Sequence, residues 1–222
     1  MCGQILTKKN ISEHDPYICS KCYKKINFVQ SPCCMKCSRP LVDDTREYCI
    51  DCSNKIRHFD AGMALMIHDD ISRKIIYDLK YAGRRDNADM IGYELTKRAG
   101  ALIRQWDPQV VIPVPVHKSK RIQRGFNQAE TLALKLRTQI PVDCDYLIRH
   151  KKTLAQKELI PELRRRNITG AFSVHEYRKP YSSVLLVDDI YTSGSTLSEC
   201  ARVLKEKGVK KVYFLTGSIV AH

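Results

Sequence analysis

The chain has 222 residues, 43% of them apolar, which is enough material for one ordinary globular domain and a small second one. Its formal net charge of +14 at pH 7 favours polyanionic partners, either nucleic acid or small polyphosphates. No uncharged apolar stretch approaches the ~20 residues of a membrane helix, and residues 1–4 begin no hydrophobic signal segment, so the sequence excludes membrane insertion and predicts a cytoplasmic location.

Six of the ten cysteines form three CxxC pairs, whose first cysteines are 15 residues apart. In a reducing compartment such pairs indicate structural zinc bound by thiolates rather than disulfides. One tetrahedral site is complete with Cys34, Cys37, Cys49 and Cys52. The first pair needs two more ligands, so a second site would use Cys19, Cys22 and Cys2, with Cys33 or His14 as alternatives for the fourth.

Two explanations of the incomplete first pair stay open: a degenerate second site, or an upstream start codon that would supply another cysteine. So short a segment cannot bury much core, and zinc supplies roughly 10–16 kcal/mol of folding free energy in such modules. We therefore expect a zinc-ribbon domain over residues 1–57 and a second domain over residues 58–222.

Beyond the cysteines, apolar spacing predicts strands that alternate with helices, typical of an α/β fold with a parallel sheet. We expect strands at 61–68, 110–116, 146–148, 171–174, 184–187 and 212–220. We expect helices at 70–81, 87–106, 129–137 and 197–207. The two prolines in 110–116 predict an irregular or exposed end to that strand, and residues 117–128 are predicted to form a basic loop.

The segment 184–197 is the most informative part of the chain. Four apolar residues indicate a buried parallel strand, and Asp188 and Asp189 follow at its carboxyl end, where open α/β sheets bind ligands. These acids can accept hydrogen bonds from ribose hydroxyls. The small residues that follow can surround a phosphate at the start of a helix, whose dipole favours an anion. These are Thr192, Ser193, Gly194, Ser195 and Thr196.

Most of the positive charge lies in one quarter of the chain, because residues 117–170 carry a net +8. The cations Lys118, Lys120, Arg121 and Arg124 follow the strand at 110–116, at the ligand edge of the predicted sheet. A further basic stretch at 149–170 could close over a phosphorylated substrate. It includes Arg164, Arg165 and Arg166.

Several motifs together resemble the ComF late-competence family. They are the paired CxxC ribbon, Pro-Val-Pro at 113–115, Arg-Gly-Phe-Asn-Gln-Ala at 124–129, the segment 167–172, and the segment 185–196, which resembles the phosphoribosyl-pyrophosphate (PRPP) signature of type I phosphoribosyltransferases. The resemblance implies a type I phosphoribosyltransferase-like sheet flanked by helices, behind a zinc ribbon. It also implies PRPP or a related ribose phosphate as ligand, Mg²⁺ with PRPP, and a role in handling single-stranded DNA during DNA uptake.

On this interpretation the acids hold the 2′- and 3′-hydroxyls of ribose and residues 192–196 hold the 5′-phosphate. We assign Asp188, Asp189 and Arg124 to the catalytic group. Lys118, Arg121 and Gly125 join the phosphate loop as ligand-binding residues. Candidate DNA contacts are Lys120 and the three arginines at 164–166. Two alternatives stay open: an active phosphoribosyltransferase on an unknown nucleobase or amine acceptor, and a non-catalytic module for single-stranded DNA or for a helicase or channel partner.

Overall fold

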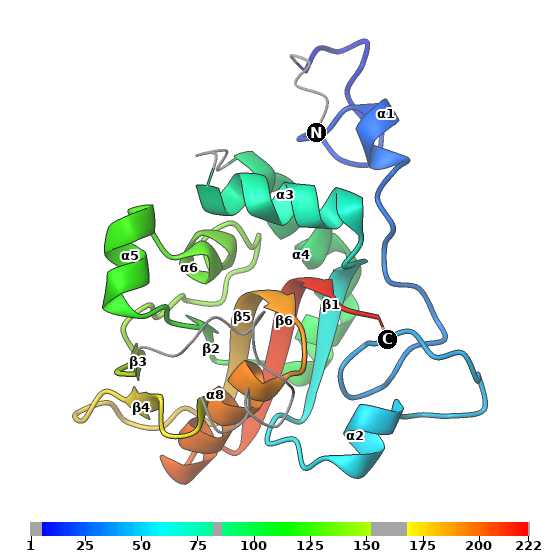
Figure 1. Cartoon of the computed structure of the whole chain (residues 1–222). Coiled ribbons are helices and arrows are strands. Elements are labelled where there is room, and N and C mark those ends of the chain that lie inside the picture. The colour runs from blue at the N-terminus through cyan, green and yellow to red at the C-terminus, as the bar shows by residue number, and fades with distance from the viewer. Residues whose placement is uncertain (1–5, 82–85, 152–167, 222) are drawn as a thin grey trace.

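The computed structural model describes residues 6–81, 86–151 and 168–221 of the chain (Figure 1). Its centre is a four-stranded sheet with the strand order β1-β6-β5-β2, in which every pairing is parallel. The strands are β1 (Ala61–Ile67), β2 (Val110–Pro113), β5 (Ser183–Tyr191) and β6 (Lys211–Ile219). A separate antiparallel pair joins β3 (Leu147–Arg149) to β4 (Phe172–Val174).

Helices cover both faces of this sheet. One face carries α3 (Asp70–Tyr81), α4 (Asp86–Trp106) and α6 (Gln128–Ala133), and the other carries α8 (Ser195–Glu206). Successive residues of a strand point to opposite faces, so Val184 and Leu186 pack with α8 while Leu185 and Val187 pack toward α4. The predicted α/β class with a parallel sheet flanked by helices is therefore confirmed. Within the described residues, no helix combines the length and the apolar character needed to cross a membrane.

The structure corrects four predicted boundaries. Residues 118–124, expected within a loop, form the helix α5 (Lys118–Arg124), because His117 caps its start and Gly125, in the left-handed region at φ 76°, ends it. The next helix, α6, ends at Ala133 rather than at residue 137. Strand β2 ends at Pro113, and β5 continues past residue 187 to Tyr191.

The cysteine-rich N-terminal segment wraps around the edge strand β1. Its short helices are α1 (Ser20–Tyr23) and α2 (Ile50–Asn54). Between them, the Asn27 carbonyl accepts from Ile67 N–H at 2.8 Å and Val29 N–H donates to the Leu65 carbonyl at 3.0 Å, so this segment covers backbone groups that an edge strand would otherwise expose. The first CxxC pair consequently lies toward α4 and the other two lie toward α8.

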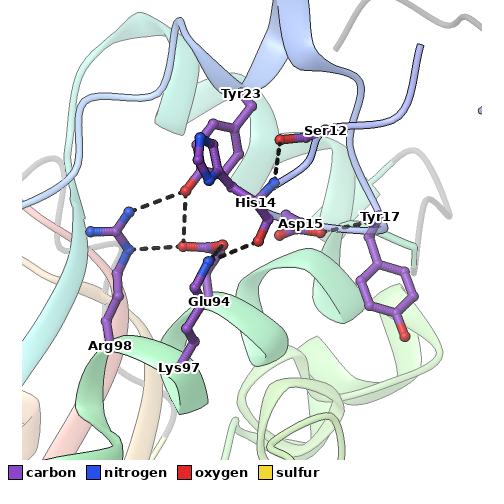
Figure 2. A network of polar contacts seen from close by, with 8 residues as sticks. All are labelled: Ser12, His14, Asp15, Tyr17, Tyr23, Glu94, Lys97 and Arg98. Atoms are coloured by element: carbon purple, nitrogen blue, oxygen red, sulfur yellow. Dashed lines mark hydrogen bonds and ion pairs between the residues drawn. The ribbon is translucent and has the colours of Figure 1, made fainter. Parts of the chain in front are cut away.

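A polar network connects residues 12–23, around the first CxxC pair, to α4 (Figure 2). Arg98 Nε donates to Glu94 Oε2 at 2.8 Å, and Arg98 Nη2 donates to the Tyr23 hydroxyl at 3.2 Å. Lys97 Nζ reaches the His14 carbonyl at 2.9 Å. The N-terminal segment is thus fixed to the sheet domain by charged side chains as well as by apolar packing.

Candidate functional site

Four cysteines from the second and third CxxC pairs converge on one point. The sulfur atoms of Cys34, Cys37, Cys49 and Cys52 all lie within 4.8 Å of one another, and the first three residues are buried. The sulfur atoms of Cys37 and Cys49 are 3.6 Å apart. A tetrahedral zinc with bonds of ~2.3 Å to sulfur separates its ligands by about 3.8 Å, so the residues fit a closed structural zinc site.

The first CxxC pair does not take part in a comparable cluster of metal ligands within the described residues. Cys19 is buried and Cys22 is partly buried, but neither joins a group of three potential metal ligands in this part of the chain. Cys2 lies outside the described residues. The second zinc site that would use these three cysteines stays a prediction.

A cavity of about 360 Å³ opens at the carboxyl ends of β2 and β5. Both predicted acids line it, together with Thr192 and Thr196 from the segment that follows β5. Lys120 and Arg124 reach it from α5. The topology therefore brings together residues that are far apart in the sequence, at the sheet edge where open α/β folds bind ligands.

The two acids have different surroundings. The Asp189 carboxylate forms an ion pair with Lys80 of α3, in which Oδ2 and Nζ are 2.5 Å apart. Asp188 accepts a hydrogen bond from the Asp189 N–H at 2.8 Å. Burial, followed by the charge of Asp189, raises the pKa of Asp188 to about 7, so near neutral pH this carboxyl exchanges readily between a hydrogen-bond donor and an acceptor.

The rest of the lining is strongly basic. Arg149 of β3 and Lys80 of α3 join Lys120 and Arg124 around the acids. The pKa of Lys120 is lowered by burial and then by the charges of Arg149 and Arg124. An anion with several negative charges would stabilise this group of cations most, because it can offset the repulsion between all of them at once.

A buried amide adds a directed donor to this lining. Arg124 Nη1 donates to Gln128 Oε1 at 3.1 Å, and Gln128 is only 2% exposed. Its Nε2 has no hydrogen-bond partner among the residues that the structure describes. A buried donor without a partner costs free energy, so a ligand oxygen at this position would be stabilising.

The turn between β5 and α8 is compact. Gly194 precedes α8 in the left-handed region at φ 71°, and the hydroxyl oxygens of Ser193 and Ser195 are 2.9 Å apart. The first turn of α8 carries no acidic side chain, which leaves the positive end of the helix dipole uncompensated there. This turn is arranged as anion-binding helix N-termini are.

Not every predicted site residue lines the cavity. Lys118 and Arg121 are exposed on α5, where Arg121 pairs with Glu130 at 3.4 Å, and Gly125 ends that helix. Ser193, Gly194 and Ser195 form the turn but are not part of the cavity wall. Arg164, Arg165 and Arg166 fall outside the described residues.

Sequence reasoning missed Lys80, His68 and Arg73 as cavity residues. It included Gln128 and Arg149 only within longer basic stretches, at 117–128 and 149–170, and gave neither residue a role of its own. Lys80 lies in the last turn of α3, a helix whose apolar spacing indicates ordinary core packing. Arg149 is the last residue of the short strand β3, 39 positions before Asp188. Their only sequence signal was a basic side chain close to a predicted strand or helix end.

Residues 1–53 match the double zinc ribbon domain family. Among curated relatives, Competence protein F of Haemophilus influenzae is 38% identical over 109 residues, 47% of this chain and 48% of that protein. The chain thus spans about half the length of this relative. Competence protein ComFC of Bacillus subtilis is 25% identical over 207 residues, which cover 87% of this chain and 80% of that protein. DNA utilization protein YhgH of Salmonella typhimurium is 26% identical, over 88% of this chain and 87% of its own length.

The match to a double zinc ribbon agrees with the four converging cysteines. The alignments with ComFC and YhgH cover 87% and 88% of the chain, so the similarity extends over the parallel sheet and its cavity. These similarities confirm the resemblance of the chain to the ComF family.

Proposed function

We propose that the cavity binds PRPP or a related ribose phosphate, and that the protein takes part in handling single-stranded DNA during DNA uptake. One observation carries the first half: two acids, two threonines and a group of cations line a single cavity at the carboxyl ends of parallel strands. The names of the competence and DNA utilization relatives support the second half. In this proposal residues 1–57 form the zinc-ribbon domain and residues 58–222 form the ligand-binding domain.

The roles of the residues follow from their chemistry. Asp188 and Asp189 accept from the 2′- and 3′-hydroxyls of ribose, with Lys80 holding the second carboxylate in place. The turn at 192–195 and Thr196 donate to the 5′-phosphate at the start of α8. Lys120 and Arg124 face the diphosphate, whose charge offsets their mutual repulsion.

Magnesium enters this proposal with the diphosphate. Carboxylate oxygens suit Mg²⁺, but Asp189 is already paired with Lys80 at 2.5 Å, which favours a hydrogen-bonding role over direct metal ligation. When bound, the ion would neutralise charge on the diphosphate. The chain's own contribution is to orient the ribose and to hold the diphosphate among cations.

Transfer chemistry is a second candidate function, favoured by the position of Lys120 and Arg124. If an acceptor attacks the anomeric carbon, its new bond to carbon forms as the bond to the diphosphate oxygen breaks, and the leaving group takes the electron pair. Preorganised cations stabilise the charge that develops on this leaving group. The acceptor would be a nucleobase or an amine.

Calorimetric titration with PRPP and Mg²⁺ tests the ligand. The zinc-loaded protein should bind, and the double variant Asp188→Asn/Asp189→Asn should lose binding while it keeps its affinity for single-stranded DNA. The matched control is Asp145→Asn, which changes an exposed carboxylate away from the cavity and should bind as the unaltered protein does. Failure of the unaltered protein to bind PRPP would refute the ligand proposal.

DNA binding is tested by fluorescence anisotropy of a labelled single strand across a salt series. Removing one cation that pairs with a DNA phosphate should reduce the slope of log affinity against log salt by about 0.7. We expect Lys120→Met and Arg124→Met to reduce both affinity and slope. If they leave both unchanged, DNA does not use the cavity rim.

A further inference from the structure

A buried arginine connects the four-cysteine centre with the turn that follows β5. Arg39 lies two residues after Cys37 and is only 6% exposed. Its Nη1 donates to Asp51 Oδ2 at 2.8 Å, and its Nη2 donates to the Thr192 carbonyl at 3.3 Å. Asp51 stands between the metal ligands Cys49 and Cys52, so a single guanidinium spans a metal-binding knuckle and the candidate phosphate turn.

This placement is electrostatically favourable. A zinc ion with four thiolates carries a net charge of −2, and a buried charge is tolerated only when it is paired. The ion pair between Arg39 Nη1 and Asp51 Oδ2 places a carboxylate directly against the buried guanidinium. The guanidinium can therefore stay buried beside the metal centre while its second nitrogen reaches across to Thr192.

The turn also rests on the same apolar core as the metal centre. Tyr191, 1% exposed, stacks on Phe214 with ring centroids 5.4 Å apart and meets Phe59 edge to face. Three of the four metal-binding cysteines belong to this core. A Cβ added to Gly194 would lie 2.3 Å from the Tyr191 hydroxyl oxygen, so the turn lies directly against this ring.

We propose that Arg39 is a positioning residue through which the metal centre sets the conformation of the turn at 192–194. With zinc bound, the knuckle holds Asp51, Asp51 holds Arg39, and Arg39 fixes the Thr192 carbonyl at the entrance to α8. Without zinc, this restraint is lost and the first turn of α8 opens more often. The consequence for phosphate affinity rests on the proposed function, whereas the effect on the turn does not.

Hydrogen–deuterium exchange of the peptide 192–200 reads the turn directly, because the Ser198 amide bonds to the Gly194 carbonyl at 2.9 Å. The key variant is Arg39→Lys, since lysine keeps the positive charge but lacks the fork that serves two acceptors. The control is Arg46→Lys on the same ribbon, where an arginine 58% exposed pairs only with nearby Asp43 among the residues described.

In zinc-loaded Arg39→Lys, we expect Ser198 to exchange about tenfold faster, as the loss of one charge-assisted hydrogen bond would allow. Zinc-stripped unaltered protein should show the same acceleration, and Arg46→Lys should show none. Zinc content is measured for every sample. Exchange at the unaltered rate in zinc-loaded Arg39→Lys would overturn the proposal.

If Arg39→Lys fails to hold zinc, Asp51→Asn provides the second comparison, because it keeps Arg39 and an acceptor oxygen but removes the charge that anchors it. We expect faster exchange of the same peptide, and an unchanged rate would again overturn the proposal. Calorimetry with PRPP and Mg²⁺ should show about tenfold weaker binding by Arg39→Lys. If even the unaltered protein binds no PRPP, the proposed ligand is wrong, while the exchange comparison still decides the role of Arg39.

Discussion

Gly194 is the position at which one added methyl group should most disturb the candidate phosphate turn. Alanine at φ 71° costs about 1–2 kcal/mol in backbone strain. Its Cβ would also lie 2.3 Å from the Tyr191 hydroxyl oxygen and 2.6 Å from Cζ. Because Tyr191 is packed on Phe59 and Phe214, it cannot move away freely, and overpacking of this kind adds a cost of about 1–3 kcal/mol.

Gly125 is the matched control. It also has positive φ, 76°, but a Cβ added there meets no atom within 4 Å in the described structure. Urea unfolding should therefore show a loss of about 2–5 kcal/mol for Gly194→Ala and only the strain of about 1–2 kcal/mol for Gly125→Ala. Equal losses in the two variants would show that the contact with Tyr191 does not restrict the turn, and the reasoning would fail.

Three further predictions concern groups elsewhere in the chain. Burial, and then the charge of Glu94, raise the pKa of Asp15 to about 7, so the folded protein binds more protons than the unfolded chain between about pH 4 and 7 and stability falls as the pH rises through that window. Urea unfolding of Asp15→Asn should show a shallower fall and a higher stability at pH 8, and an unchanged pH profile would contradict this. Cys37→Ser should lose zinc, measured by metal analysis of the purified protein, whereas Cys144→Ser should keep it; retention by both would remove Cys37 from the metal site. Lys80→Met should weaken PRPP binding in calorimetry about tenfold or more, because it leaves the carboxylate of Asp189 without its cation, and unaltered affinity would argue against this role.

The sequence was most informative where function and fold use the same residues. The order of strand, acids and small residues at 184–197 predicted a site at the carboxyl end of a strand, and Asp188 and Asp189 do line the cavity there. The two complete CxxC pairs predicted the four-cysteine centre because ligand number and spacing alone determine it. The helix at 70–81 was predicted with the observed bounds, since its apolar spacing is regular.

Other features depend on contacts that local sequence does not encode. The charge of residues 118–124 suggested a loop, although the glycine at position 125 is an ordinary signal for a helix end. The cap at His117 was not predictable, because histidine is not among the preferred N-cap residues. Lys80 meets Asp189, more than a hundred residues later, only once the sheet has formed. The division of the N-terminal segment between the two faces of the sheet follows from its pairing with β1, which no periodicity in 27–29 predicts.

The position of β6 in the sheet has a consequence for how the chain folds during synthesis. Of the four strands of this sheet, β6 is the last to be synthesised, yet it lies between β1 and β5 and pairs with both. The sheet therefore cannot be completed until residues 211–219 have been synthesised, so the non-local pairings of β6 with β1 and β5 form late. The four cysteines of the metal centre lie within residues 34–52, so the nascent chain can bind zinc before β6 has been synthesised.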